Sequence, residues 1–261
     1  MISVAEALAN IFDLITPLEA EPVPLRAAAG RVLVEPVIAA RNQPPFRASV
    51  MDGYAVRSAD LPGPLTVIGE AAAGHGFDGQ IAPGQALRIF TGAPVPEGAD
   101  RVIIQEDVRR DGDVIRLNEN ADTKAYVRAI GADFQIGDTL KAPRRLTPAD
   151  LALIASMNVA DVRVARRPRV ALLATGDELV MPGEAPAPDQ IIASNTFGLA
   201  AMVEAEGAIA QVLPIARDSE GSLEAALSLT NGSDLLVTIG GASVGDHDLV
   251  GKVALGKGLE R

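Results

Sequence analysis

The hydrophobic pattern is clearest in the C-terminal third of the chain, where three apolar runs alternate with two helix-like segments. The runs lie within residues 169–178, 208–216 and 234–239. Apolar runs of this length that stop at turns are typical of strands buried on both faces. Capping and helix-ending residues flank the segments between them, namely Ser194–Thr196, Gly207, Ser222 and Asn231–Gly232. The pattern predicts a β-α-β-α-β unit with right-handed crossovers.

Acidic and glycine residues follow each predicted strand. The carboxyl ends of parallel strands meet at one edge of a sheet, where ligands bind in open α/β folds. Glycine-rich turns present backbone amides that cradle phosphates, and Mg²⁺ can screen carboxylates that would otherwise repel them. Acids and glycines are also common in ordinary loops, but three converging loops favour a site. Five acids are expected at this edge: Asp177, Glu178, Asp218, Asp246 and Asp248.

The N-terminal two thirds change character twice. Ser3 and Glu6 have capping-box spacing, and apolar residues at helical intervals follow them until Pro17. Residues 31–38 read as an edge or broken strand because they contain Pro36. Short apolar runs between Gly and Pro turns predict a β-rich lobe. The expected division is an N-terminal helix (1–25), a small mixed α/β domain (26–45 and 138–168), an inserted β lobe (46–137) and an incomplete α/β domain (169–261).

Polar residues with ligand-like character also occur outside the predicted parallel sheet. Asp52 lies between apolar neighbours and is expected to be partly buried beside a partner. Thr91 and Gly92 close a strand, and Arg128 precedes Asp133. Each of these features alone is typical of turn chemistry. A basic cluster typical of a solvated face comprises Arg163, Arg166, Arg167 and Arg169.

Composition excludes several classes of protein. The chain has 261 residues, of which 48% are hydrophobic and 3% aromatic, so aliphatic cores in two or three domains are expected. A net charge of −11 argues against general nucleic-acid binding. Zero cysteines exclude disulfides, Cys-based zinc sites and thiol nucleophiles. No apolar segment reaches membrane-spanning length and no signal peptide is evident, so a cytoplasmic protein without membrane partners is expected.

Four motifs occur in order along the chain: Met51–Val56, Thr91–Pro96, Thr175–Leu179 and Gly240–Asp248. In these motifs the sequence resembles the molybdopterin molybdenumtransferases, the family that includes the gephyrin E-domain. The resemblance implies an elongated multi-domain chain with a β-rich lobe and a three-layer α/β/α molybdopterin-binding domain. It implies a homodimer, with other molybdenum cofactor biosynthesis proteins as further candidate partners. It also implies a Mg²⁺-dependent reaction of adenylylated molybdopterin with molybdate that releases AMP.

The resemblance assigns candidate roles to individual positions. Expected catalytic residues are Asp52, Thr91, Glu178, Asp218 and Asp248, of which Glu178 and Asp248 are the expected Mg²⁺ ligands. Expected substrate-binding residues are Arg128, Asp133, Thr175, Gly176, Asp177, Ser194, Asn195, Gly240, Gly241, Ser243 and Gly245.

Departures from the family pattern leave alternatives open. Ala242 stands where the family has Val, and the element at Gly131–Phe134 lacks the usual Glu. A basic Lys-Pro-Gly-Lys-Pro-like segment, the rest of the α/β domain and a β-barrel domain are absent from the 261 residues. The alternative is therefore a non-catalytic molybdopterin-binding or scaffold module, or an inactive fragment of the enzyme. A nucleotide-binding α/β protein with another substrate would explain the sheet but not the lobe motifs.

Overall fold

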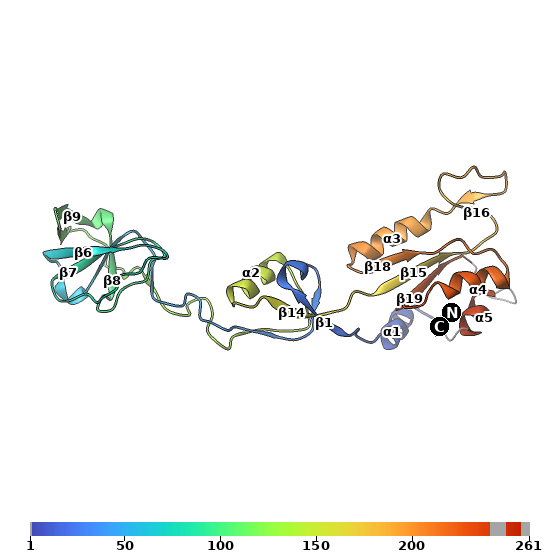
Figure 1. The fold of residues 1–261 in the computed structure, drawn as a ribbon, viewed down its shortest axis with the longest axis horizontal. Helices are drawn as coiled ribbons and strands as arrows, with labels where there is room; N and C mark the ends of the chain where they lie inside the picture. Colours follow the sequence, from blue (N-terminus) through green and yellow to red (C-terminus); the bar gives the residue numbers. More distant parts are fainter. Residues whose placement is uncertain (1, 241–248, 257–261) are drawn as a thin grey trace.

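The chain is elongated, with a β-rich lobe at one end, a small middle body and an α/β body at the other end (Figure 1). The computed structural model describes residues 2–240 and 249–256. The expected mixed, multi-domain α/β architecture with a β-rich lobe is therefore confirmed. Among the described residues, no helix is both long and apolar enough to cross a bilayer.

The lobe is built on a six-stranded sheet with the order β8-β5-β7-β6-β10-β9. Its strands are β5 (Gly53–Val56), β6 (Leu65–Ala71), β7 (Gln85–Ile89), β8 (Arg101–Ile104), β9 (Val108–Asp111) and β10 (Val114–Leu117). Side chains alternate between two faces of a strand, so β5 contributes Ala55 to one apolar cluster and Tyr54 and Val56 to another. All four residues of β5 are buried, which makes this strand the centre of the lobe.

Two short antiparallel ladders connect the lobe to the middle body, so the chain leaves and returns side by side (Figure 1). The ladders pair β3 (Val37–Ile38) with β12 (Thr139–Leu140), and β4 (Ala48–Ser49) with β11 (Val127–Arg128). Single 3₁₀ turns, which lie in the middle body and the lobe, are η1 (Leu25–Ala27), η2 (Ser58–Asp60) and η3 (Gln105–Asp107).

The middle body is a four-stranded sheet with one helix, α2 (Pro148–Ser156). The strand order is β1 (Ala20–Pro24), β14 (Asp161–Ala165), β2 (Val32–Leu33) and β13 (Arg144–Arg145). Thr147 and Asp150 form a reciprocal capping box, and Pro148 opens α2. The strand predicted around Pro36 is broken, because β2 and β3 belong to different sheets. Residues 20–24, expected in the N-terminal helical segment, instead form β1 and pair with β14.

The α/β body contains the predicted β-α-β-α-β unit, with three parallel strands in the order β18-β15-β19. Its elements are β15 (Arg169–Ala174), β16 (Leu179–Val180), β17 (Ile191–Ile192), α3 (Asn195–Ala205), β18 (Ile209–Val212), α4 (Glu220–Ser228), β19 (Leu235–Ile239) and α5 (Leu249–Gly256). Leu173 of β15 packs with Leu223, Leu227 and Val250, so α4 and α5 cover one face of the sheet. Helix α3 contacts β18 and β15 and lies on the other face (Figure 1).

One of the two predicted helix starts in this body is wrong, and the other lies at the predicted residue without the side-chain cap. Helix α4 begins one turn earlier than predicted, with Ser219 rather than Ser222 at its N-cap position. The Ser222 hydroxyl instead accepts the backbone N–H of Arg217 at 2.8 Å. Ser194 occupies the N-cap position of α3 but makes no side-chain capping bond. The sequence signal located the helices, while local turn geometry decided which hydroxyl is used.

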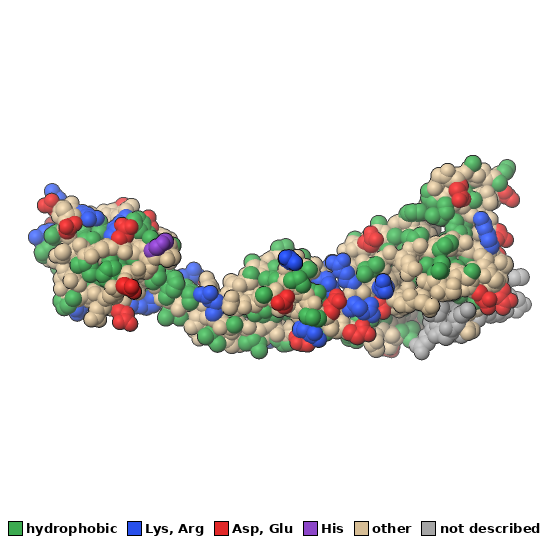
Figure 2. Space-filling model, viewed as in Figure 1, with side chains coloured by type: hydrophobic (Ala, Val, Ile, Leu, Met, Phe, Trp, Pro, Cys, Tyr) green, Lys and Arg blue, Asp and Glu red, His purple; other side chains and the backbone are tan. Residues whose placement is uncertain are grey.

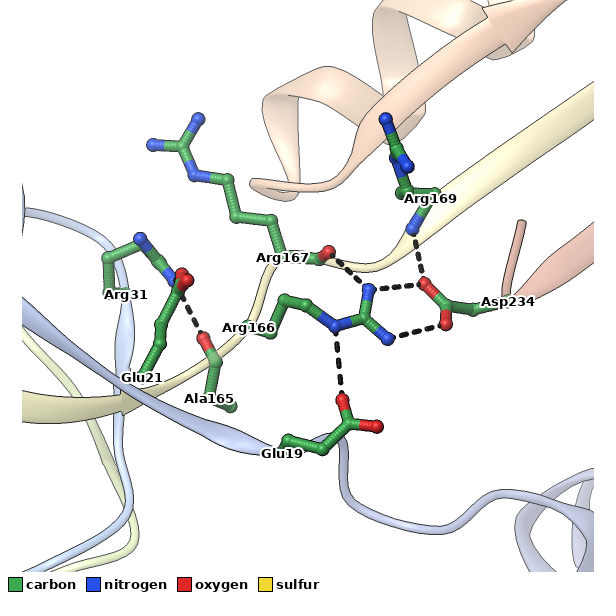
Figure 3. Close-up of polar contacts among 8 residues, drawn as sticks. All are labelled: Glu19, Glu21, Arg31, Ala165, Arg166, Arg167, Arg169 and Asp234. Atoms are coloured by element: carbon green, nitrogen blue, oxygen red, sulfur yellow. Dashed lines mark hydrogen bonds and ion pairs between the residues drawn. The ribbon is translucent and has the colours of Figure 1, made fainter. Parts of the chain in front are cut away.

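A polar junction joins the middle body to the α/β body (Figure 3). Arg166 lies in the connection from β14 to β15, and its two Nη atoms donate to the carboxylate of Asp234 at 2.9 and 2.7 Å. Its Nε donates to Glu19 at 3.1 Å, and the Arg169 N–H donates to Asp234 at 2.7 Å. Figure 2 shows basic and acidic side chains interspersed over this region. Within the cluster predicted as a solvated basic face, Arg166 therefore forms an ion pair that links the middle body to the α/β body.

The N-terminal helix α1 (Val4–Leu14) has the predicted capping box between Ser3 and Glu6. None of its residues is buried. An apolar helical face normally packs against a partner, so this face is available for one. The exposed large apolar side chains on and beside α1 are Ile2, Val4, Leu8, Ile11, Phe12, Leu14 and Ile15.

Candidate functional site

The lobe holds Asp52 and Thr91 in direct contact. Asp52 lies in the turn before β5, and Thr91 follows β7, which pairs with β5. The backbone N–H and the hydroxyl of Thr91 both donate to Oδ1 of Asp52 at 2.8 Å. These bonds, with a smaller contribution from Arg88, hold the pKa of Asp52 below its ordinary value. The half-buried carboxylate with a partner, expected from the sequence, is thus present and ionised at neutral pH.

Arg88 is a lobe residue that no sequence pattern singled out. Its Nη1 donates to the carbonyl oxygen of Gly53 at 2.9 Å and its Nη2 to Oε1 of Gln105 at 2.7 Å. The guanidinium lies 5.2 Å from the ring centroid of Tyr54 and 4.6 Å from that of Phe90. Arg88 therefore fixes the Asp52–Gly53 turn and supplies a positive charge next to it. In the sequence, Arg88 is marked only as a polar residue among the apolar residues of a predicted strand.

Arg128 and Asp133 form an ion pair at the base of the lobe. Arg128 belongs to β11, which pairs with β4, and Ala48 of β4 bridges to Pro94 beyond the Thr91 turn. The Asp133 backbone N–H donates to Gln43 at 2.8 Å. The two residues predicted as substrate-binding are thus brought together, and β4 links them to the Thr91 segment.

The sheet edge at the carboxyl end of β15 is tightly built. Thr175 is 3% exposed, and its N–H donates to Ile239 of β19 at 3.0 Å. The Gly176 N–H donates to Ala216 at 3.1 Å, so this turn joins the ends of both neighbouring strands. Gly240 has φ +91°, and a Cβ there would lie 2.7 Å from the Thr175 carbonyl oxygen. Only glycine fits this position without strain.

Glu178 folds back over the Gly176 turn. Gly176 has φ +146°, and a Cβ on it would lie 2.3 Å from Oε2 of Glu178. The glycine therefore provides both the backbone conformation and the space for this carboxylate. Glu178 is exposed and accepts no hydrogen bond on its carboxylate from any described residue. It is free to bind a cation.

Asp177 and Asp218 are also brought together at this edge. The Asp218 backbone N–H donates to Oδ1 of Asp177 at 3.2 Å. Ser194 and Asn195 lie at the start of α3, where both are exposed and, within the described part of the chain, make no side-chain hydrogen bond to these acids. The remaining predicted site residues, together with Asp246, lie outside the described residues: Gly241, Ser243, Gly245 and Asp248.

The described donors fit Mg²⁺ only as an ion shared with a ligand. Across residues 2–240 and 249–256, no group of three or more His, Cys, Asp or Glu side chains could hold a metal ion. Mg²⁺ commonly binds one or two carboxylates and completes its shell with water and substrate phosphates. The unpaired Glu178 carboxylate beside glycine turns matches that mode of binding.

Comparison with family models decides the identity. Residues 2–158 match the MoeA N-terminal region (domain I and II). The chain belongs to the MoeA family. Residues 171–260 also match a probable molybdopterin binding domain, so the resemblance to molybdopterin molybdenumtransferases is confirmed along most of this MoeA-family chain.

Relatives and solved structures agree with this assignment. A molybdopterin molybdenumtransferase of Nostoc sp. is 37% identical over 274 residues, covering 100% of this chain and 63% of the relative. That of Haemophilus influenzae is 38% identical, covering 89% of this chain and 59% of the relative. A crystal structure of a molybdopterin biosynthesis MoeA protein from Pyrococcus horikoshii superposes with a TM-score of 0.84 at 32% identity, covering 98% of this chain and 66% of that one. The chain thus spans about three fifths of these curated relatives.

Proposed function

We propose that this chain acts in molybdenum cofactor biosynthesis by inserting molybdate into adenylylated molybdopterin with release of AMP. The observation that supports this proposal most directly is the edge of the sheet at the carboxyl end of β15. There the Glu178 carboxylate lies unpaired over Gly176, in a turn that joins the two neighbouring strand ends. This edge lies in the region that matches a molybdopterin binding domain. Its chemistry suits a pyrophosphate group bound with a divalent cation.

The α/β body would bind the nucleotide-linked pterin. Glu178 and Asp248 would hold Mg²⁺, which would offset the charge of the pyrophosphate when bound. Asp218 orients Asp177 through its backbone N–H. Cleavage of a phosphoanhydride depends mainly on positioning and charge stabilisation, so no nucleophilic side chain is required. The amides of Gly240, Gly241 and Gly245, with Ser243, would hold phosphate, and contacts to the pterin would come from Thr175, Gly176, Asp177, Ser194 and Asn195.

The lobe would supply the second half of the site. Asp52 is held ionised by two bonds from Thr91, so it can accept a proton or orient a water molecule beside the reacting oxyanion. Arg128 carries the charge that molybdate requires, and at present Asp133 neutralises it. Anion binding at Arg128 would therefore displace or compete with Asp133.

The shape of the chain supports the proposal that it acts as a homodimer. Asp52 and Thr91 lie in the lobe, and Glu178 lies in the α/β body at the opposite end (Figure 1). One copy cannot place both groups around one small molecule, whereas the lobe of one copy facing the α/β body of another can. The unburied apolar face of α1 offers surface for such an association. Partnership with other molybdenum cofactor biosynthesis proteins and a cytoplasmic setting remain predictions.

The competing proposal is a molybdopterin-binding or scaffold module without turnover, or an inactive fragment. The reason to keep it is that the chain spans about three fifths of the length of the molybdopterin molybdenumtransferases that it matches, so the activity of the whole protein is only a proposal for this chain. In that case the pocket would bind adenylylated molybdopterin, but molybdate would not trigger release of AMP.

Calorimetric binding of adenylylated molybdopterin with and without Mg²⁺, followed by molybdate addition and an AMP assay, tests the proposal. We expect Mg²⁺-enhanced binding and molybdate-dependent AMP release, both reduced in Glu178→Gln. Glu204→Gln is the matched control because Glu204 is exposed on α3 and makes no side-chain bond within the described residues. Binding without AMP release would favour the module, and absence of binding would contradict both proposals.

A further inference from the structure

A single guanidinium group ties together the turn that carries Glu178. Arg217 follows β18, and its Nη1 donates to three carbonyl oxygens of that turn. The distances are 3.4 Å to Gly176, 2.8 Å to Asp177 and 3.0 Å to Leu179. All the side-chain hydrogen bonds that Arg217 makes within the described part of the chain come from this one nitrogen.

The turn needs such support. Its own backbone hydrogen bond, from the Leu179 N–H to Gly176, is long at 3.4 Å. Three carbonyl dipoles converge next to the exposed carboxylates of Asp177 and Glu178, which concentrates negative potential at one place. A guanidinium in the middle offsets that potential, because hydrogen bonds from a charged donor are stronger than neutral ones.

Arg217 is itself anchored to α4. Its backbone N–H donates to the Ser222 hydroxyl at 2.8 Å. The neighbouring Asp218 N–H donates to Asp177 at 3.2 Å. The loop after β18 therefore contacts the turn after β15 at two points: through the Arg217 side chain and through the Asp218 backbone N–H.

We propose that Arg217 is a positioning residue for the proposed reaction. It fixes the Gly176–Leu179 turn so that the Glu178 carboxylate is presented at the carboxyl edge of the sheet for Mg²⁺ bound with the substrate pyrophosphate. Arg217 acts through the turn and contacts no substrate. This inference rests on the proposed function, so its test needs a readout that does not depend on turnover.

The first readout is hydrogen exchange of the chain without ligand. Arg217→Gln removes the charged donor, and we expect about tenfold faster exchange in peptides covering residues 176–180, as the loss of a charge-assisted hydrogen-bond group implies. Exchange in β15 and β19 should not change. Arg167→Gln is the matched control, because its side chain is exposed and unbonded within the described residues. Unchanged exchange at 176–180 would overturn the inference.

The second readout is the Mg²⁺ dependence of binding adenylylated molybdopterin. Arg217→Gln should reduce the Mg²⁺-dependent gain in affinity about tenfold. The Kd without Mg²⁺ should change by a smaller factor, through Gly176 and Asp177 of the same turn. General destabilisation would weaken both values equally. Arg217→Lys should recover part of the gain, because the lysine ammonium group keeps the positive charge and offers three N–H donors.

The outcomes separate this inference from the proposed function. Wild-type binding with full Mg²⁺ dependence retained in Arg217→Gln would overturn the positioning role and leave the function standing. If the wild-type chain does not bind adenylylated molybdopterin, the proposed function fails, and the positioning role in that reaction is overturned with it. In that case, faster exchange at 176–180 would still show that Arg217 holds the turn.

Discussion

The ion pair between Arg166 and Asp234 makes a measurable prediction about the junction of the middle and α/β bodies (Figure 3). Hydrogen bonds from Arg166, and then from the Arg169 N–H, lower the pKa of Asp234 from its ordinary 3.8 to about 2. A pKa unit corresponds to about 1.36 kcal/mol, so this shift sets an upper bound of about 2.4 kcal/mol. The two side chains are 22% and 33% exposed, so solvent screens the pair. After that screening we expect about 1 kcal/mol.

The sign of the pH dependence follows from the lowered pKa. The contribution of Asp234 is fully present above its unfolded pKa of 3.8 and is lost as pH falls through the folded value of about 2. Asp234→Asn should therefore destabilise the α/β body by about 1 kcal/mol at pH 7, and the difference should shrink to about half by pH 3.

The assay is urea unfolding followed by hydrogen exchange of peptides from β15 and β19. These peptides report on the α/β body alone, whereas both tyrosines, Tyr54 and Tyr126, are outside it. Asp189→Asn is the matched control, because Asp189 is exposed and makes no side-chain bond within the described residues. The reasoning is refuted if the Asp234 and Asp189 variants are equally stable at pH 7, or if their difference is the same at pH 3.

Three further predictions concern other parts of the chain. Gly240→Ala should destabilise the α/β body by about 1–3 kcal/mol in the same assay, because φ is +91° and the new Cβ would lie 2.7 Å from the Thr175 carbonyl oxygen; wild-type stability would contradict this. Thr91→Val keeps the backbone donor but removes the hydroxyl, so an NMR titration should show a raised pKa of Asp52, and AMP release should fall. Phe12→Glu should convert a dimer to monomers in sedimentation experiments at nearly unchanged monomer stability, since Phe12 is 69% exposed; a persistent dimer would rule out α1 as the interface.

Much of the fold could be predicted from short-range patterns. The buried run of β15 and the capping box between Ser3 and Glu6 are local signals, and both elements form where those signals lie. Strand β1 was missed because its short segment, with two prolines, is stabilised by pairing with β14, far away in the sequence. The N-cap of α4 was misassigned because the Ser222 hydroxyl accepts a local hydrogen bond from the backbone N–H of Arg217, five residues earlier.

The site was predicted where backbone geometry leaves a signature in the sequence. Gly176 and Gly240 have positive φ values and close neighbours, which only glycine accommodates. Arg88 and Arg217 were not identified, and Arg166 was interpreted as part of a solvated basic face. An arginine whose partners are distant carbonyls or carboxylates looks like any surface arginine in a single sequence. Their roles became visible only when the three-dimensional contacts were known.

The central claim is that one reaction site is shared between the lobe of one copy and the α/β body of another. Subunit complementation between Asp52→Asn and Glu178→Gln, each inactive alone, tests it most directly. After mixing and subunit exchange, about half of the dimers are mixed and each of these has one intact site, so about a quarter of the wild-type AMP release should return. AMP release that stays at the level of the separate variants in mixed dimers confirmed by mass spectrometry would contradict the claim.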